Sequence, residues 1–498
     1  MIDDRHPVIV ATGQVLERDE LVSPVELMAR AAEICFSQVP SLRRRIEHLS
    51  VVNVLTGAGL APASDLARRL RIKPERAETT TVGGNTPQWL VNNLADSIWS
   101  GNLEVALIAG GEAQRSAWAG YRSTEASGKA DPVVGDERLG FGDAELAAGL
   151  IAPVHVYPLF ESVLAQRTGR TFAEQRDFLG RLLSPMTSVA ASRDCAWFPA
   201  ERSPADISIL SSENRLVCEP YSKRMCAFLG VDQAASVLIC SYGVAKAAGV
   251  ADSCVFCWSG ADASDVWFPS ARPDPGSSPG LRVAGNAALA AASLGIDDVR
   301  WLDFYSCFPC VLEMACDAIV VDPFDSRGLT VTGGLPYFGG PGNAYTLFAI
   351  ATMAELLRTS GSGVGSSSSK SSNNEAGLVS GIGWYATKHS VGVYATAPNE
   401  KGWCRANTDR EQVEIDRSAI PVALEVPGFG MSATVDASAV HYDSSGGVTG
   451  APVLATLDDG RRVAASPAES VKRSELEGLN LAGERVHVAG SPPRYQPS

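Results

Sequence analysis

The sequence predicts a soluble α/β protein of two α/β units in tandem, followed by a small, mainly β domain. Short apolar runs rich in β-branched residues alternate with helical stretches, which is typical of βαβ units and a buried parallel sheet. After about residue 420 the helical stretches give way to alternating β patterns. With 498 residues, 45% of them hydrophobic, the chain can bury a large core and is expected to hold more than one domain.

The first unit is expected to cover residues 1–120 and 232–280. Its first part alternates β-like and helical runs in the spacing that a parallel sheet requires. The predicted elements are strands at 7–15, 51–57 and 105–113 and helices at 24–39 and 87–102.

Residues 121–231 interrupt this rhythm with a more charged and more helical stretch. We interpret it as a loop domain packed beside the sheet, because excursions of this size usually carry ligand contacts.

The second unit is expected at residues 281–398, with a clear helix at 282–296 and another within 341–361. A Gly/Ser-rich tract at 359–377 is too polar to pack and is expected to be a disordered surface loop. In the β domain, 420–498, Asp459-Gly460 lies between two β runs and predicts a type I′ hairpin.

Charge and composition exclude several functions. A net charge of −14 argues against nucleic acid or an anionic membrane as the main partner. No apolar run reaches the roughly 20 residues that span a bilayer, and the N-terminus resembles neither a secretory signal nor a transit peptide. We therefore expect a cytoplasmic protein. The eleven cysteines are scattered through apolar segments, as reduced core residues would be, and no zinc-ligand spacing predicts a metal site.

Three turns follow predicted strands: Gly83–Asn85, Tyr305–Phe308 and Gly339–Asn343. Ligands in open α/β sheets gather at the carboxyl ends of the strands, so we expect these turns to be neighbours. Gly83-Gly84-Asn85 precedes a helix, where backbone amides favour an anion or oxyanion. The alternative is a tight turn without a ligand.

Cys307 lies at a strand-to-helix junction, where the helix N-terminus lowers the pKa of a thiol and can make it a nucleophile. With Cys310 it also has the C-x-x-C spacing of a redox dithiol. The alternative is two small buried residues at the start of a core helix.

His389, between two β-like runs, is a candidate general base or hydrogen-bond donor, with a structural histidine as the alternative. Arg215, Lys223 and Arg224, at the end of the excursion, are candidate phosphate ligands or else solvated surface cations.

Five segments occur in an order that resembles the thiolase superfamily over about residues 5–398. The closest likeness is to the thiolase-like proteins of type 1, relatives of the sterol-carrier-protein thiolases with an additional C-terminal β domain. The segments are "GGNTPQWLVNNLADSIWSGNLEVALIAGGEAQ", "VDQAASVLICS", "YSCFP", "GGLPYFGGPGN" and "TKHSVGVYAT".

The resemblance implies a five-layered αβαβα fold, coenzyme A or acyl-CoA as ligand, and acyl transfer or Claisen-type chemistry. In the family the usual partner is a second copy of the chain. The resemblance does not decide whether this homodimer forms beside the additional domain. The turn residues Gly84, Asn85, Gly340 and Asn343, together with Arg224, are the expected coenzyme A contacts.

The family's catalytic groups are missing at the matching positions. The acyl-accepting cysteine corresponds to Gly84, the histidine of Gly-His-Pro to Gly340, and the second cysteine to Gly381 or, in a shifted register, to Ala386. The oxyanion-binding position corresponds to Tyr305. Losing such groups typically costs several orders of magnitude in rate.

Three hypotheses follow. The first is acyl transfer in which Cys307 is the nucleophile, His389 the base and Tyr305 the oxyanion donor. The second is a non-catalytic acyl-CoA binder or partner subunit. The third is a thiol-disulfide oxidoreductase based on Cys307 and Cys310.

Overall fold

The structure is a computed structural model that describes residues 2–122, 129–361 and 375–497. Its two α/β units have the same order of strands. The strands of the first unit are β1 (Pro7–Leu16), β2 (His48–Val51), β3 (Arg76–Thr80), β4 (Val105–Ala113) and β8 (Asp232–Ser241). Those of the second are β9 (Val255–Ser264), β10 (Trp301–Asp303), β11 (Ala376–Gly383) and β12 (Lys388–Ala395). The sequence predicts residues 232–280 in the first unit, but β9 pairs with β12 along most of its length, so residues 255–264 are grouped here with the second.

The first unit has the order β3-β2-β4-β8-β1 and the second β10-β11-β12-β9. β8 and β12 are each antiparallel to both of their neighbours, whereas β2–β4 and β10–β11 are parallel pairs. The second unit thus repeats the first, without a counterpart of β3 among the described residues. A short antiparallel pairing of β1 with β9 joins the two units into one sheet. One edge strand of this sheet is β10, and the other is the short strand β5 (Val133–Val134), which pairs with β3.

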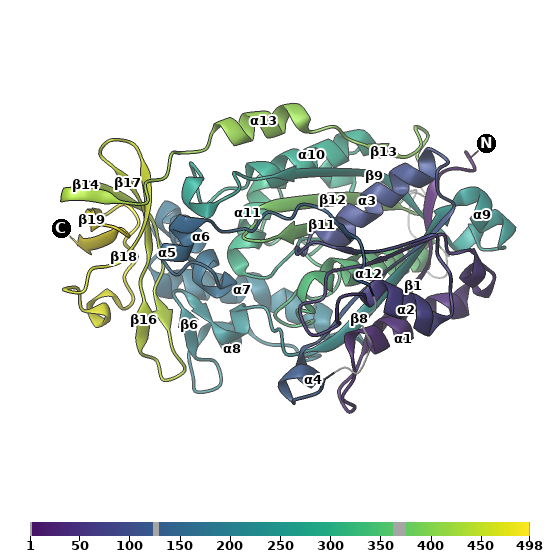
Figure 1. The fold of residues 1–498 in the computed structure, drawn as a ribbon, viewed down its shortest axis with the longest axis horizontal. Helices are drawn as coiled ribbons and strands as arrows, with labels where there is room; N and C mark the ends of the chain where they lie inside the picture. Colours follow the sequence, from purple (N-terminus) through teal and green to yellow (C-terminus); the bar gives the residue numbers. More distant parts are fainter. Residues whose placement is uncertain (1, 123–128, 362–374, 498) are drawn as a thin grey trace.

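Helices form three layers around the two halves of the sheet. α1 (Pro24–Gln38) and α2 (Pro62–Leu70) pack on the first unit, and α10 (Pro279–Ala292) and α11 (Pro309–Ile319) on the second. α3 (Thr86–Trp99) and α12 (Tyr345–Gly361) contact each other and strands of both units, so they form the central layer (Figure 1). This is the five-layered αβαβα arrangement that the resemblance implies, and the prediction is confirmed.

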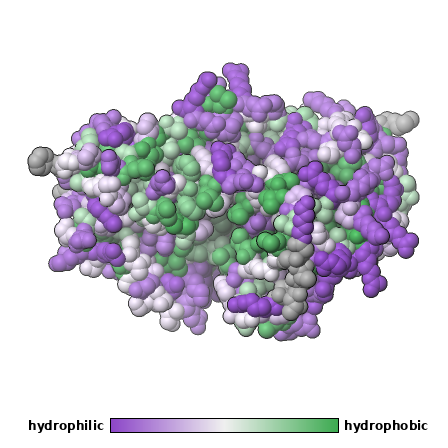
Figure 2. Space-filling view, in the orientation of Figure 1, coloured by the Kyte–Doolittle hydropathy of each residue, from purple (hydrophilic) through white to green (hydrophobic). Residues whose placement is uncertain are grey.

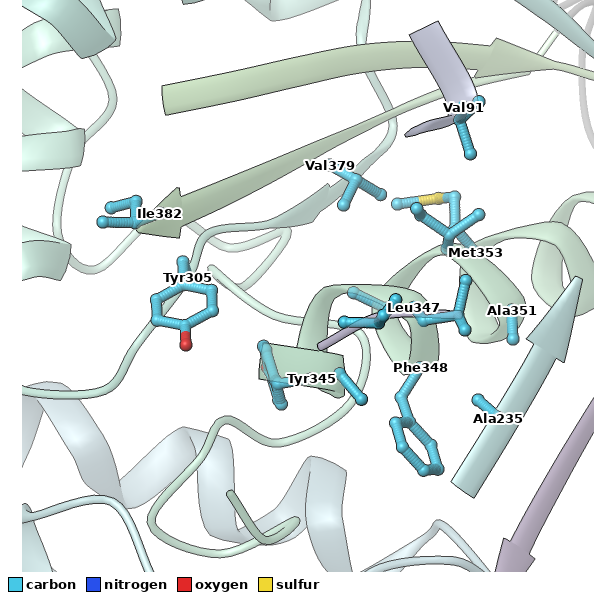
Figure 3. Close-up of a cluster of buried hydrophobic side chains, with 14 of the residues drawn as sticks. Val91, Ala235, Tyr305, Tyr345, Leu347, Phe348, Ala351, Met353, Val379 and Ile382 are labelled. Carbon is cyan, nitrogen blue, oxygen red and sulfur yellow. The ribbon is translucent and has the colours of Figure 1, made fainter. Parts of the chain in front are cut away.

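The central layer is buried on both sides. α12 places almost every side chain from Tyr345 to Leu357 in the core, because a sheet lies on either side of it. Figure 3 shows the buried cluster that results, with these labelled members: Val91 of α3, Leu347, Phe348, Ala351 and Met353 of α12, Val379 and Ile382 of β11, and Ala235 of β8.

The segment between β4 and β8 is mainly helical. A reciprocal capping box of Thr171 and Glu174 starts α7, and α6 and α7 pack against α11. The elements of this segment, apart from β5, are α4 (Gln114–Trp118), α5 (Asp143–Ala147), α6 (Pro153–Thr168), α7 (Phe172–Ala191), α8 (Pro204–Ser208), β6 (Leu216–Cys218), β7 (Tyr221–Ser222) and the 3-10 turn η2 (Lys223–Met225).

Residues 359–377 do not form one loop. Residues 359–361 continue α12, residues 376–377 begin β11, and residues 362–374 of the expected disordered tract lie outside the described residues. Two further helices lie beside the sheet: α9 (Tyr242–Ala247) contacts β1 and β8 of the first unit, and α13 (Asp409–Arg417) contacts α10 and β9 of the second. α13 follows the short strand β13 (Cys404–Arg405), which pairs with β9.

The C-terminal region is a closed five-stranded barrel with a hydrophobic core of its own, which confirms the small, mainly β domain that the sequence predicts. It lies at the end of the molecule away from the N-terminus (Figure 1). The strands, in barrel order, are β14 (Val426–Ser438), β17 (Val453–Leu457), β18 (Arg462–Pro467), β20 (Arg494–Pro497) and β19 (Arg485–Gly490).

The predicted hairpin at Asp459-Gly460 is present as β17–β18, but its turn is not type I′. Type I′ needs positive φ at two central residues, and here only Gly460 has it, at 87°. Gly460 N donates to Leu457 O, and Leu457 N donates to Arg461 O, the pattern of a type I turn followed by a left-handed glycine.

Several contacts attach the barrel to the rest of the chain, among them the following two. β15 (His441–Tyr442) pairs with β6 of the helical segment and with β16 (Val448–Gly450). Arg462, only 1% exposed, donates to the Arg272 carbonyl oxygen at 3.2 Å and lies 3.1 Å from the Asp436 carboxylate.

We expect Arg462→Ala to destabilise the protein by about 3–5 kcal/mol, because it leaves the half-buried Asp436 carboxylate without its cation. Urea unfolding measures the change. Arg461→Ala is the matched control: its guanidinium is exposed and pairs with Asp459, so no measurable change in stability is expected. Equal effects of the two substitutions would contradict a role for Arg462 at this junction.

Candidate functional site

The three turns expected to be neighbours do meet. Gly83 N donates to the Asn343 side-chain oxygen at 2.9 Å, and the Thr346 hydroxyl donates to Gly84 O at 2.5 Å. The Tyr305 ring packs directly on Gly84. One buried region therefore contains the turn between β3 and α3, the turn between β10 and α11, and the loop before α12.

Tyr305 fills the space over Gly84. A Cβ placed on Gly84 would lie 2.7 Å from both Tyr305 Cζ and the Ile382 carbonyl oxygen, and closer still to the Tyr305 hydroxyl. The ring is buried, and its edge-to-face contact with Tyr345 has a centroid separation of 5.4 Å (Figure 3). Burial also raises the pKa of the Tyr305 phenol, so the group is a neutral hydroxyl. Residue 84 thus has no nucleophile and no room for one.

Cys307 differs from the expectation of an activated thiol. Burial raises its pKa to about 12, which outweighs hydrogen bonds that favour the thiolate, including one with Tyr157. Backbone groups at the start of α11 favour the thiolate, but burial outweighs them, so the pKa of this thiol lies above its ordinary value.

Cys310 is also buried, and burial raises its pKa as well. Its thiol donates to the Tyr157 carbonyl oxygen at 3.6 Å, and both cysteines are free. A redox dithiol needs a stabilised, accessible thiolate, and neither thiol has that environment.

His389 is 1% exposed and faces the outer helix layer. Its Nε2 lies 3.0 Å from the Asp265 carboxylate and 3.1 Å from the Ser278 hydroxyl. Ser278 caps α10, and Asp265 accepts from the Gly280 amide at its first turn. His389 thus supports the start of α10, and none of its contacts in the described part of the chain is with Cys307.

The neighbours of His389 on β12 reach the Gly-Gly-Asn turn instead. Lys388 Nζ donates to Val82 O at 2.6 Å, and Asn85 Nδ2 donates to the Ser390 hydroxyl at 3.1 Å. Side chains alternate along a strand, so Lys388 and Ser390 face the side opposite to His389. The sequence interpretation missed Lys388, although this alternation was a signal for it.

Arg224 lines a cavity of about 350 Å³ that combines cations with aromatic side chains. Its guanidinium donates to the Asp206 carbonyl oxygen and lies 3.5 Å from the highly exposed carboxylate of Glu213. The other lining residues are Phe198, Arg202, Lys223, Cys226, Phe228, Pro336 and Tyr337.

This basic cavity, defined by the residues just named, borders the buried turns. Ala227 N donates to Cys307 O at 3.0 Å, and Gly340 N donates to Phe228 O at 2.8 Å. Residues 226–228 therefore connect the wall of the cavity to the loops that contain Cys307 and Gly340. Figure 2 shows a hollow with hydrophobic side chains around it near the middle of one face of the molecule.

The predicted site residues are thus divided among three environments. Arg224 lines the basic cavity, and Asn85 and His389 line a second cavity of about 300 Å³. Gly84, Tyr305 and Cys307 are buried residues of the turns. Asn343 holds the Gly83 turn to Asn53, with Nδ2 3.1 Å from the Asn53 carbonyl oxygen. In the described ranges no three His, Cys, Asp or Glu side chains are grouped to hold a metal, and no helix is long and apolar enough to cross a bilayer.

No family model matches the sequence, and no curated protein matches it. Among solved structures, the chain is similar over its full length to a monomeric SCP2-thiolase-like protein type 1 from Mycobacterium smegmatis, with 28% identity and a TM-score of 0.83 over 100% of both chains. The acetyl-CoA acetyltransferase of Syntrophomonas wolfei is 15% identical, with a TM-score of 0.56 over 79% of this chain and 99% of the other.

The Acat5 thiolase of Ascaris suum, in complex with coenzyme A, is 14% identical, with a TM-score of 0.56 over 78% of this chain and 99% of the other. The chain therefore has the thiolase fold, and the resemblance inferred from its sequence is confirmed.

We expect Gly84→Ala to destabilise the protein by about 1–3 kcal/mol, because the added methyl group has no space beside Tyr305. Tyr305→Ala alone should cost about 3–5 kcal/mol through the cavity that it creates. In the double variant the methyl group no longer meets the Tyr305 ring, although it still meets the Ile382 carbonyl oxygen. The cost of the double variant should therefore be smaller than the sum of the two single costs by at least about 1 kcal/mol.

A double-mutant cycle from urea unfolding measures this coupling. Gly295→Ala is the control, since a Cβ there meets its nearest atom at an ordinary 3.5 Å. Additive costs of the Gly84 and Tyr305 substitutions would show that the ring does not occupy this space.

Proposed function

We propose that the protein binds coenzyme A or an acyl-CoA in the basic cavity and does not accept the acyl group on a cysteine. The observation that carries this proposal is the Tyr305 ring over Gly84, which leaves the thiolase fold without its nucleophile at the expected turn. The thiolase fold and the cluster of cations around Arg224 support the choice of ligand.

The residues of the basic cavity match the parts of coenzyme A. Arg202, Lys223 and Arg224 supply the positive charge that phosphates require, and guanidinium groups bind phosphate oxygens in pairs. Phe198, Phe228 and Tyr337 supply apolar surface for an adenine ring or a pantetheine arm. The exposed Glu213 side chain is free to turn away from Arg224 when an anion approaches.

A pantetheine arm would reach the buried turns along residues 226–228. The Tyr305 hydroxyl is then a hydrogen-bond donor available to a thioester carbonyl, as the Gly84 amide would be, whereas Gly340 N already donates to Phe228 O. Asn85 and Asn343 act in this proposal as supports of the turn, because their side chains bond to Ser390 and to Gly83 and Asn53.

Acyl transfer through Cys307 is the competing function, and the environment of that thiol disfavours it. An acyl-accepting cysteine attacks as the thiolate, and at a pKa of about 12 the thiolate is rare near neutral pH. A general base would raise its population, but the nearest contacts of His389 are Asp265 and Ser278.

Arg224→Ala should weaken coenzyme A binding about 10- to 100-fold, because a charged hydrogen bond to phosphate contributes about 1.5–3 kcal/mol. Isothermal titration calorimetry with coenzyme A measures the affinity. Arg5→Ala, at an exposed arginine paired with Asp3, is the control and should leave the affinity unchanged. Unchanged affinity in the Arg224 variant, or no coenzyme A binding by the native chain, would refute the proposed site.

Incubation with acetyl-CoA should leave the intact mass of the protein unchanged, in the native chain and in Cys307→Ala alike. Mass spectrometry of the intact chain detects the gain of an acetyl group. A gain in the native chain that disappears in Cys307→Ala would establish the acyltransferase and overturn the non-covalent proposal.

A further inference from the structure

The cavity of about 300 Å³ near Asn85 is separate from the basic cavity. It lies among the start of α3, the strands β9 and β12, the segment 135–138 and helix α13. The two cavities share no lining residue. Its volume is at the low end of the range for ligand sites, so it suits a molecule of a few heavy atoms.

Lys388 brings a buried cation to this cavity. Its residue is only 6% exposed, and its Nζ donates one hydrogen bond, to Val82 O. No described carboxylate lies within ion-pair distance of Nζ, although an ammonium group has three protons to donate. Burial lowers the pKa of Lys388 to about 8. A buried ammonium without a carboxylate partner is unfavourable unless it binds an anion or loses its proton.

Four other groups at the cavity have a buried polar atom without a hydrogen-bond partner in the described structure: Thr81 Oγ1, Asn85 Oδ1, Asp262 Oδ1 and His389 Nδ1. The Asn85 and Asp262 oxygens are acceptors and do not bind a carboxylate, whereas the Thr81 hydroxyl is a donor. The Thr81 side chain is 8% exposed, and its hydroxyl has no hydrogen-bond partner in the described structure. Asn85 is 5% exposed; its Nδ2 bonds to Ser390, whereas its Oδ1 has no partner in the described structure. Asn85 and Thr86 also bring the first turn of α3 to the cavity, and a helix N-terminus favours negative charge.

The other charged groups that face Lys388 are largely matched already. On segment 135–138, Asp136 is held by Arg138 at 2.6 Å; on β9, Asp262 is held by Arg405 at 2.9 Å. On β12, His389 is bonded to Asp265. α13 contributes two exposed carboxylates that line the cavity, Asp409 and Asp416, whereas α3 contributes no charged side chain. Lys388 is therefore the buried cation at this cavity that has no carboxylate of its own.

We propose that this cavity binds a small carboxylate, with the Lys388 ammonium as its counter-charge and the Thr81 hydroxyl as an additional donor. The exposed Asp409 and Asp416 disfavour a ligand with a second negative charge, so a monocarboxylate is the expected class. This site is independent of the proposed coenzyme A site, because Arg224 and Lys388 line different cavities.

The test uses propionate as the probe and ligand-observed NMR titration of the full chain. Binding needs the protonated amine, so affinity should fall about 30-fold between about pH 7 and about pH 9.5 as Lys388 loses its proton. Lys388→Met keeps the length and removes the charge, and should abolish binding. Lys246→Met, at an exposed lysine paired with Asp4, is the matched control and should bind as the native chain does.

Thr81→Val provides a second variant, which should weaken propionate binding several-fold even if Lys388→Met fails to fold. Coenzyme A affinity should be unchanged in both variants, which separates this site from the proposed function. Absence of propionate binding to the native chain, or equal binding by native chain and Lys388→Met, would overturn the proposal. So would an affinity that does not change with pH.

Discussion

The structure depends on the burial of helix α3 between two halves of one sheet. Three polar side chains of this helix region, Asn85, Gln88 and Asn92, are almost fully buried on the face that meets the second unit. Each occupies the space that a Cβ would need on a glycine of that unit: Gly383 for Asn85, Gly392 for Gln88 and Gly260 for Asn92. The strands can approach the helix this closely because these positions carry no side chain.

Gln88 and Asn92 of this polar stripe are hydrogen-bonded internally, as buried polar side chains usually are, whereas the Asn85 Oδ1 has no partner in the described structure. Gln88 Nε2 donates to Asn92 Oδ1 at 3.0 Å, the Tyr394 hydroxyl donates to Gln88 at 2.7 Å, and Asn92 donates to Asp262 at 3.1 Å. These bonds link α3 to β12 and β9, so the turn before α3 is held in place from the second unit. The Gly-Gly-Asn turn therefore keeps a defined shape without a catalytic residue.

This fixed turn separates two cavities of different chemistry. On one side, residues 226–228 lead from Gly340 and Cys307 to the cations around Arg224. On the other side, Lys388 and Asn85 face a polar cavity bordered by α13. Between them, the Tyr305 ring closes the space over Gly84.

The sequence by itself determined the two α/β units, the β domain and the hairpin at Asp459-Gly460, because these follow from local periodicity and from the turn residues along the chain. It could not determine where the individual helices and strands within residues 121–231 begin and end. It also could not determine the end of α12, because the helical pattern there continues into a polar tract. Only the tertiary structure decided that the thiol of Cys307 is enclosed, that His389 supports α10 and that Lys388 is a buried cation. The physical reason is that the state of each group depends on burial and on partners far away in the chain: Tyr157 for Cys307, Asp265 for His389 and Val82 for Lys388.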